Sequence, residues 1–161
     1  MDIQTDYTRQ IVQELAFLAD EISGGQPAET QAGLEILLDR LALAYHLSSR
    51  EAEPATASVR EPTQEEYEQL RAILAKRFPL LGLYRSSSLS PKESTSQGFL
   101  TGDALDDLVD IVRDMREVNW RWSNNGKQDA IWHFRWGYEH HWGEHLRDLQ
   151  RYLYLQRFIS A

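Results

Sequence analysis

Hydrophobic residues recur along this chain at steps of three and four, the period of a helix that buries one face. The first such stripe lies in residues 5–22: Tyr7, Ile11, Leu15, Leu18 and Ile22. Polar joins with glycine or proline, which interrupt helices, separate several of the stripes. The pattern predicts helices over residues 5–22, 29–48, 63–78, 103–123 and 129–158.

The second predicted helix is apolar on nearly all of its sides. Its main stripe is Leu34, Leu37, Leu38, Leu41 and Tyr45. Ile36, Leu43 and Leu47 lie on the opposite side. A helix that is apolar all round is usually buried on two sides. We therefore expect residues 29–48 at the centre of a helical bundle or at a contact between two copies of the chain.

Two joins are long. Residues 49–62 are rich in Ala, Glu, Ser and Pro and predict a flexible linker. Thr63 and Glu66 have the capping-box spacing that starts the helix after it. The stretch 80–102 is the least regular and contains a second predicted linker near 85–98. A short hairpin is the alternative there, because apolar residues flank a polar centre.

A chain of 161 residues with 42% hydrophobic residues is large enough for one domain with its own core. We expect an all-α domain over residues 1–161, a bundle of about five helices with the long, aromatic C-terminal helix in its core.

No apolar run reaches the roughly 20 residues that span a bilayer, and the start has no secretory pattern. Cysteine is absent, which suits a reducing compartment, so we expect a cytoplasmic protein.

The net charge of −8 argues against partners that need a basic surface. Nucleic acid and anionic membranes repel such a protein on average, and no lysine- or arginine-rich run offsets this. The expected partner is another protein, bound by a monomer or a homodimer.

Six acidic residues lie on one side of the helix predicted over 103–123, within about 100° of arc. They are Asp103, Asp106, Asp107, Asp110, Asp114 and Glu117. Clustered carboxylates could bind a divalent cation or a basic partner. The apolar stripe on the opposite face instead favours a solvated acidic face, with local pairs between Asp110 and Arg113 and between Glu117 and Arg121.

Residues 129–158 hold four of the five histidines and three of the five tryptophans, so candidate chemistry concentrates in this helix. Glycine inside a helix costs about 1 kcal/mol relative to alanine. Gly137 and Gly143 therefore indicate the close approach of another helix or of a large aromatic ring.

Polar residues also interrupt the apolar faces of the last two helices. Arg135 and Glu139 are four residues apart and can form a partly buried pair, which is either structural or part of a binding pocket. Asn119 lies in the apolar stripe of the preceding helix, where a buried amide needs partners. The candidate pocket is lined by Asn119, Arg135, Glu139, His141, Trp142 and His145.

His141 and His145 have the spacing at which two imidazoles on a helix can share zinc or iron. Glu139 points roughly 120° away from them, so no third ligand lies on the same predicted face. A third ligand would have to come from another helix. We therefore expect no bound metal and no cofactor, and the simpler interpretation is that these histidines donate to neighbouring carboxylates or carbonyls.

Several short motifs resemble the signature of an uncharacterised bacterial family, a domain of unknown function. They are Trp132-His133-Phe134-Arg135, Tyr138-Glu139, His141-Trp142-Gly143 and His145-Leu146, preceded by Asp106-Asp107-Leu108, Asp110-Ile111 and Arg113-Asp114. The resemblance implies a small, helical, bacterial protein. It implies no activity, cofactor or catalytic residue. If the family has a site, the resemblance directs attention to Arg135, Glu139, His141 and His145.

Three classes of function stay open. The sequence lacks a phosphate loop, dinucleotide fingerprint, nucleophile elbow and complete metal motif, which favours a non-enzymatic binding or adaptor protein that acts through protein–protein contact. One alternative is a metal-dependent or acid–base enzyme that uses polar groups of the C-terminal helix. The other is a small-molecule sensor in which Arg135 clamps a carboxylate or phosphate.

Overall fold

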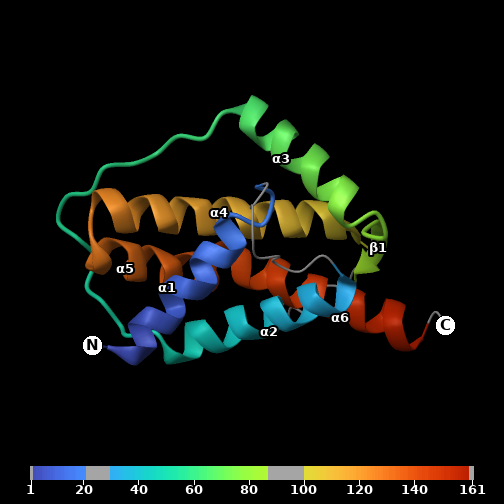
Figure 1. Cartoon of the computed structure of the whole chain (residues 1–161), viewed down its shortest axis with the longest axis horizontal. Coiled ribbons are helices and arrows are strands. Elements are labelled where there is room, and N and C mark those ends of the chain that lie inside the picture. The colour runs from blue at the N-terminus through green and yellow to red at the C-terminus, as the bar shows by residue number, and fades with distance from the viewer. Residues whose placement is uncertain (1, 21–29, 87–99, 160–161) are drawn as a thin grey trace, which may run out of the picture.

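The computed structural model describes residues 2–20, 30–86 and 100–159 (Figure 1). Its helices are α1 (Ile3–Ala16), α2 (Gln31–Leu47), α3 (Gln64–Arg77), α4 (Ala104–Asn124), α5 (Lys127–Gly137) and α6 (Gly143–Phe158). A π-helical turn, η1 (Tyr138–Trp142), joins α5 to α6 without a break. Two short strands, β1 (Leu83–Ser86) and β2 (Leu100–Asp103), pair antiparallel. The predicted single domain of the all-α class is confirmed.

Helix α4 is the central element of the bundle. It packs against α1, α3, α5, η1 and α6 (Figure 1). Its buried apolar positions include Leu105, Leu108, Ile111, Val112 and Met115. The C-terminal helix contributes Phe134, Trp142, Leu146 and Leu149 to the same core, as expected. Because α3 and the C-terminal helix both flank α4, its polar residues also lie close to other elements.

The expectation that residues 29–48 lie at the centre of the bundle is wrong. Helix α2 packs on α1 and α6 and buries Leu34, Leu38 and Leu41. Its opposite face carries Ile36 and Leu43, which are 61% and 49% exposed within the described part of the chain. The alternative expectation, a contact between two copies of the chain through this face, stays a prediction.

The helix predicted over 5–22 ends earlier than expected, at Ala16. Arg116 Nε donates to Ala16 O at 2.9 Å, and the guanidinium of Arg77 donates to Leu18 O. Side chains from α4 and α3 thereby satisfy carbonyls that a further helical turn would have used. The end of α1 is therefore set by arginines about 60 and 100 residues away in the chain.

The start of α3 agrees with the expectation from its sequence. Thr63 accepts from the amide of Glu66, and the Glu66 carboxylate accepts from the amide of Thr63, so the predicted capping box is confirmed. Among the helices described, none is both long enough and apolar enough to cross a membrane.

The two long joins differ. Residues 49–62 contain no helix or strand and pass the turn between α4 and α5, where Asn125 donates to Ser58 O (Figure 1). Whether this segment is flexible stays a prediction. In the stretch 80–102, pairing of β1 with β2 shows that the hairpin alternative is adopted. Residues 87–98 of the second predicted linker lie outside the described residues.

Candidate functional site

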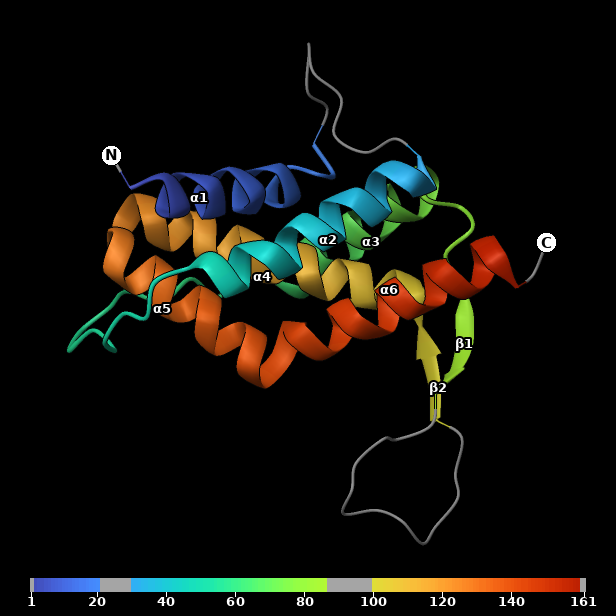
Figure 2. The ribbon, with the colours of Figure 1, turned by 90° about the horizontal axis from the view of Figure 1, so that it is seen from below.

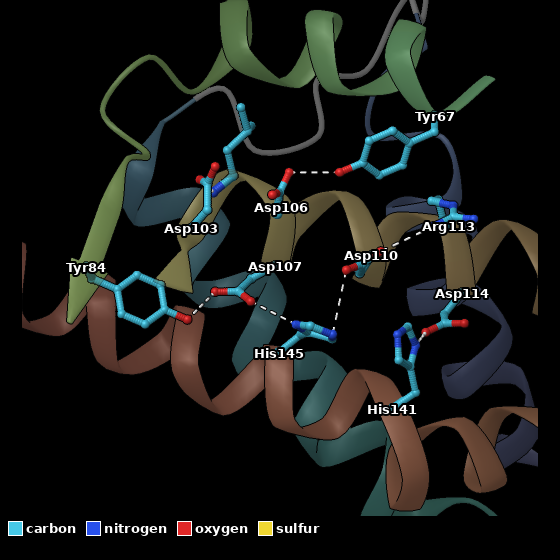
Figure 3. Close-up of polar contacts among 11 residues, drawn as sticks. Tyr67, Tyr84, Asp103, Asp106, Asp107, Asp110, Arg113, Asp114, His141 and His145 are labelled. Carbon is cyan, nitrogen blue, oxygen red and sulfur yellow. Dashed lines mark hydrogen bonds and ion pairs between the residues drawn. The ribbon is translucent and has the colours of Figure 1, made fainter. Parts of the chain in front are cut away.

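The acidic face of α4 is covered by neighbouring elements, so the expectation of a solvated face is wrong. On one side, Arg71 of α3 lies 2.9 Å from Asp103, and Tyr67 of α3 donates to Asp106 Oδ1 at 2.8 Å. On the other side, Asp107, Asp110 and Asp114 point toward η1 and α6 (Figure 3). The carboxylates share one side of α4 as predicted, but the helical period alone could not show what faces them.

His145 of α6 lies between two of these carboxylates. Its Nδ1 is 2.8 Å from Asp107 Oδ1, and its Nε2 is 3.6 Å from Asp110 Oδ2 (Figure 3). An ionised carboxylate only accepts hydrogen bonds, so Nδ1 carries the proton that it donates to the buried Asp107. This hydrogen bond raises the pKa of His145 above its usual value, against the lowering effect of burial.

His141 of η1 repeats the arrangement one turn away. Its Nδ1 lies 2.6 Å from Asp114 Oδ2, and this hydrogen bond raises the pKa of His141. The rings of His141 and His145 meet edge to face, with their centroids 5.0 Å apart. One ligand atom from each of Asp110, His141 and His145 lies within 4.8 Å of the other two. We call these three residues the Asp–His cluster.

A tyrosine holds Asp107 from the other side. Tyr84 of β1 donates its hydroxyl to Asp107 Oδ2 at 2.6 Å (Figure 3). Burial, followed by this hydrogen bond to a carboxylate, raises the pKa of Tyr84 far above its usual value. Asp148 of α6 lies close by, and burial and the charge of Asp107 raise its pKa. Tyr84 could not be found from the sequence, because it lies in the least regular stretch and nothing in its spacing relates it to α4.

The π-helical turn sets the position of His141. Such turns are wider than α-helical ones and occur frequently at functional sites. The C-terminal helix changes direction between α5 and α6, where η1 lies (Figure 2). A Cβ atom on Gly143 would lie 2.2 Å from the Tyr138 carbonyl oxygen, and one on Gly137 would lie 2.8 Å from the Trp142 ring. The expected close approach of an aromatic ring is confirmed at Gly137.

Arg135 and Glu139 lie apart from the Asp–His cluster. Arg135, with 13% of its side chain exposed, donates to the carbonyl oxygens of Tyr45 and Ser48 at 2.9 and 3.0 Å. Glu139 is 47% exposed, lies 3.8 Å from Arg135 and accepts from the Tyr45 hydroxyl at 2.9 Å. The Arg135 guanidinium also stacks over the Tyr45 ring at 4.6 Å. These bonds tie the C-terminal helix to the end of α2.

The six residues of the candidate pocket are therefore not gathered in one place. The structure brings together His141 and His145. Trp142 is fully buried and packs against Phe134 and Tyr138. Asn119 is half-buried on α4, and no hydrogen bond within the described residues joins it to Arg135 or Glu139.

The reason for expecting no metal does not hold in the folded chain. That expectation rested on the lack of a third ligand on the face that carries His141 and His145. Asp110 supplies a third oxygen ligand, and it comes from another helix, α4. Helical spacing alone could not show which residue of another helix faces His141 and His145, because it does not place α4 against η1 and α6.

Comparison with known proteins extends over nearly the whole chain. Residues 4–158 match the family model described as Domain of unknown function (DUF5063). The crystal structure of protein BF1032 from Bacteroides fragilis is similar, with a TM-score of 0.64 and 18% sequence identity. The match covers 97% of this chain and 90% of that one, and shows a shared fold. No curated protein matches this chain.

Proposed function

This chain belongs to the DUF5063 family, whose description names no activity, and we propose that it binds a divalent transition-metal ion at the Asp–His cluster. One observation carries the proposal. Both histidines donate from Nδ1 to a carboxylate, His141 to Asp114 and His145 to Asp107, which leaves the Nε2 atom of each ring as a potential ligand. Metal-binding histidines are almost always oriented by such a bond from their other ring nitrogen.

The distance between two of the three ligands is close to that expected around a metal ion. Two ligand atoms at about 2.0–2.1 Å from a tetrahedral zinc ion lie about 3.3 Å apart. His145 Nε2 and Asp110 Oδ2 are 3.6 Å apart. One ligand atom from each of the three residues lies within 4.8 Å of the other two, so the exposed His141 side chain must move closer when the ion binds, with its Nδ1 still bonded to Asp114.

The ligand types narrow the choice of ion. Imidazole nitrogens suit Zn, Cu, Fe and Ni, and two histidines with one carboxylate form the set found around non-haem Fe(II). Zinc bound by three protein ligands keeps its fourth position for water or substrate, as catalytic zinc does. Asp107 and Asp114 add negative charge next to the ligands, which favours a dication. We propose zinc or iron(II) as the ion, held with at least one open position.

Calorimetric titration of zinc into tag-free, chelator-treated protein tests the proposal. Wild-type protein should bind one ion per chain, and the variants His145→Ala and Asp110→Asn should lose that binding. His140→Ala and Asp106→Asn are matched controls, because these residues adjoin ligands or lie on the same face of α4 but outside the cluster. The proposal fails if wild-type protein shows no saturable binding of zinc or iron(II), or if His145→Ala binds as wild type does.

A second candidate function is protein–protein contact, and the exposed face of α2 favours it. Ile36 and Leu43 are seven residues apart and lie on the same side of that helix. We propose that a second copy of the chain covers them. Light scattering should then give the mass of a dimer, and Ile36→Glu should give that of a monomer.

A cytoplasmic location in a bacterium also stays a proposal, supported by the cysteine-free composition.

A further inference from the structure

We infer that Tyr84 is a positioning residue of the metal site, so that metal binding and the docking of the β1–β2 hairpin stabilise each other. The inference rests on the proposed metal binding and adds a regulatory element to it. It follows from a chain of hydrogen bonds that runs from the hairpin through α4 to a ligand on α6 (Figure 3).

Asp107 is the middle of this chain. Its Oδ2 accepts from the Tyr84 hydroxyl at 2.6 Å, and its Oδ1 accepts from His145 Nδ1 at 2.8 Å. The carboxylate is buried, so water offers little replacement for either donor. With both oxygens engaged, the carboxylate can hold the His145 ring in the orientation that turns Nε2 toward Asp110. Loss of the Tyr84 donor would free Oδ2 and allow the carboxylate to rotate.

The hairpin fixes Tyr84 by close packing. Tyr84 pairs with Gly102 across the two strands, and a Cβ atom on Gly102 would lie 2.2 Å from the tyrosine ring. Only glycine therefore leaves room for the ring in this position. The start of the hairpin is held in turn by Gly82, whose amide donates to the Tyr152 hydroxyl of α6 at 3.0 Å.

These contacts join the hairpin to α4 and α6, the helices that carry the ligands Asp110 and His145. Tyr84 contacts Asp107 on α4, and Gly82 contacts Tyr152 on α6. Asp148 adds negative charge near the Tyr84 hydroxyl, and its raised pKa reflects burial and the nearby charge of Asp107. By linkage, docking of the hairpin raises the affinity for the metal by the same factor by which bound metal favours docking.

The first experiment compares Tyr84→Phe with Tyr67→Phe in the full, tag-free chain. Tyr67 is a matched control, because it donates to Asp106, the neighbour of Asp107, but that carboxylate holds no histidine. Tyr84→Phe should weaken Zn²⁺ binding about tenfold, the lower end of the range for residues behind a ligand. It should also shift the visible absorption of bound Co²⁺, which reports ligand geometry. Tyr67→Phe should leave both unchanged.

The second experiment uses wild-type protein only, so it does not depend on how a variant folds. Hydrogen exchange in peptides that cover β1 and β2 should slow when Zn²⁺ is added. If wild-type protein binds no metal, the proposed function fails. If it binds metal but Tyr84→Phe matches wild type, or both tyrosine variants weaken binding equally, the inference about Tyr84 is overturned. Unchanged exchange of the hairpin in zinc-loaded protein overturns the coupling.

Discussion

Replacing Asp129 by alanine should lower the free energy of unfolding by about 3 kcal/mol, because it breaks a buried ion pair. Asp129 and Arg121 have 2% and 8% of their side chains exposed. Arg121 Nη1 lies 2.9 and 3.1 Å from the two carboxylate oxygens of Asp129. Asn125 also donates to Asp129 at 2.6 Å, so the carboxylate joins the end of α4 to the start of α5.

The magnitude follows from what stays behind in the variant. Removing one partner of a buried pair costs about 3–5 kcal/mol, since the other charge is left without compensation. Arg121 keeps one partner, because its Nε donates to Glu117 at 2.8 Å, which places the cost at the lower end. At about 2–4 °C per kcal/mol for a chain of this size, the melting temperature should fall by about 6–12 °C.

Glu139→Ala is the comparison that makes the test sharp. Their spacing predicts that Glu139 and Arg135 form a partly buried pair, but Glu139 is 47% exposed and the separation is 3.8 Å. Exposed pairs contribute about 0–1 kcal/mol. Urea denaturation followed by circular dichroism should therefore show a large loss for Asp129→Ala and a small one for Glu139→Ala. Equal losses, or a loss below about 1 kcal/mol for Asp129→Ala, would refute this reasoning about burial.

Three further outcomes are expected. In metal-free protein, Asp114→Asn should lower the pKa of His141 in an NMR titration, because the hydrogen bond to Asp114 is the main reason that this pKa is raised. An unchanged pKa of His141 would show that the bond is absent in solution. Gly143→Ala should lower the free energy of unfolding by about 1–3 kcal/mol, since the alanine Cβ would lie 2.2 Å from the Tyr138 carbonyl oxygen. A melting temperature equal to that of wild-type protein would contradict this. Zinc at a hundredfold excess over its Kd should raise the free energy of unfolding by about 2.7 kcal/mol, and a chelator should remove this gain. If zinc binds without this gain, the unfolded chain binds it equally well.

Local patterns predicted the helices well where the interactions that end them are local. The capping box of Thr63 and Glu66 lies within four residues, and it starts α3 as expected. The end of α1 was placed too late, because Arg116 and Arg77 of other helices bind the carbonyls of Ala16 and Leu18, at and just after its end. Contacts of that kind cannot be recognised from spacing along one segment.

The candidate site shows the same division. The i, i+4 spacing of His141 and His145 identified two of the three residues of the Asp–His cluster, and the helical period placed Asp110 on the acidic side of its own helix. The error lay in treating that side as solvated. A carboxylate on a helix surface has the same pattern whether it faces water or a histidine of another helix, so the pattern could not distinguish the two.

The sequence by itself determined the helical class, the central apolar stripe of α4, and which side chains share a face of each helix, because these follow from a period of 3.6 residues and from burial of apolar surface. Tertiary structure alone decided that Asp107, Asp110 and Asp114 meet His141 and His145, and that Tyr84 reaches Asp107 from a hairpin. The physical reason is that hydrogen bonds act over about 3 Å between atoms that lie 20 or more residues apart in the chain. Their partners are selected by how the helices pack, and that packing depends on all the apolar faces together.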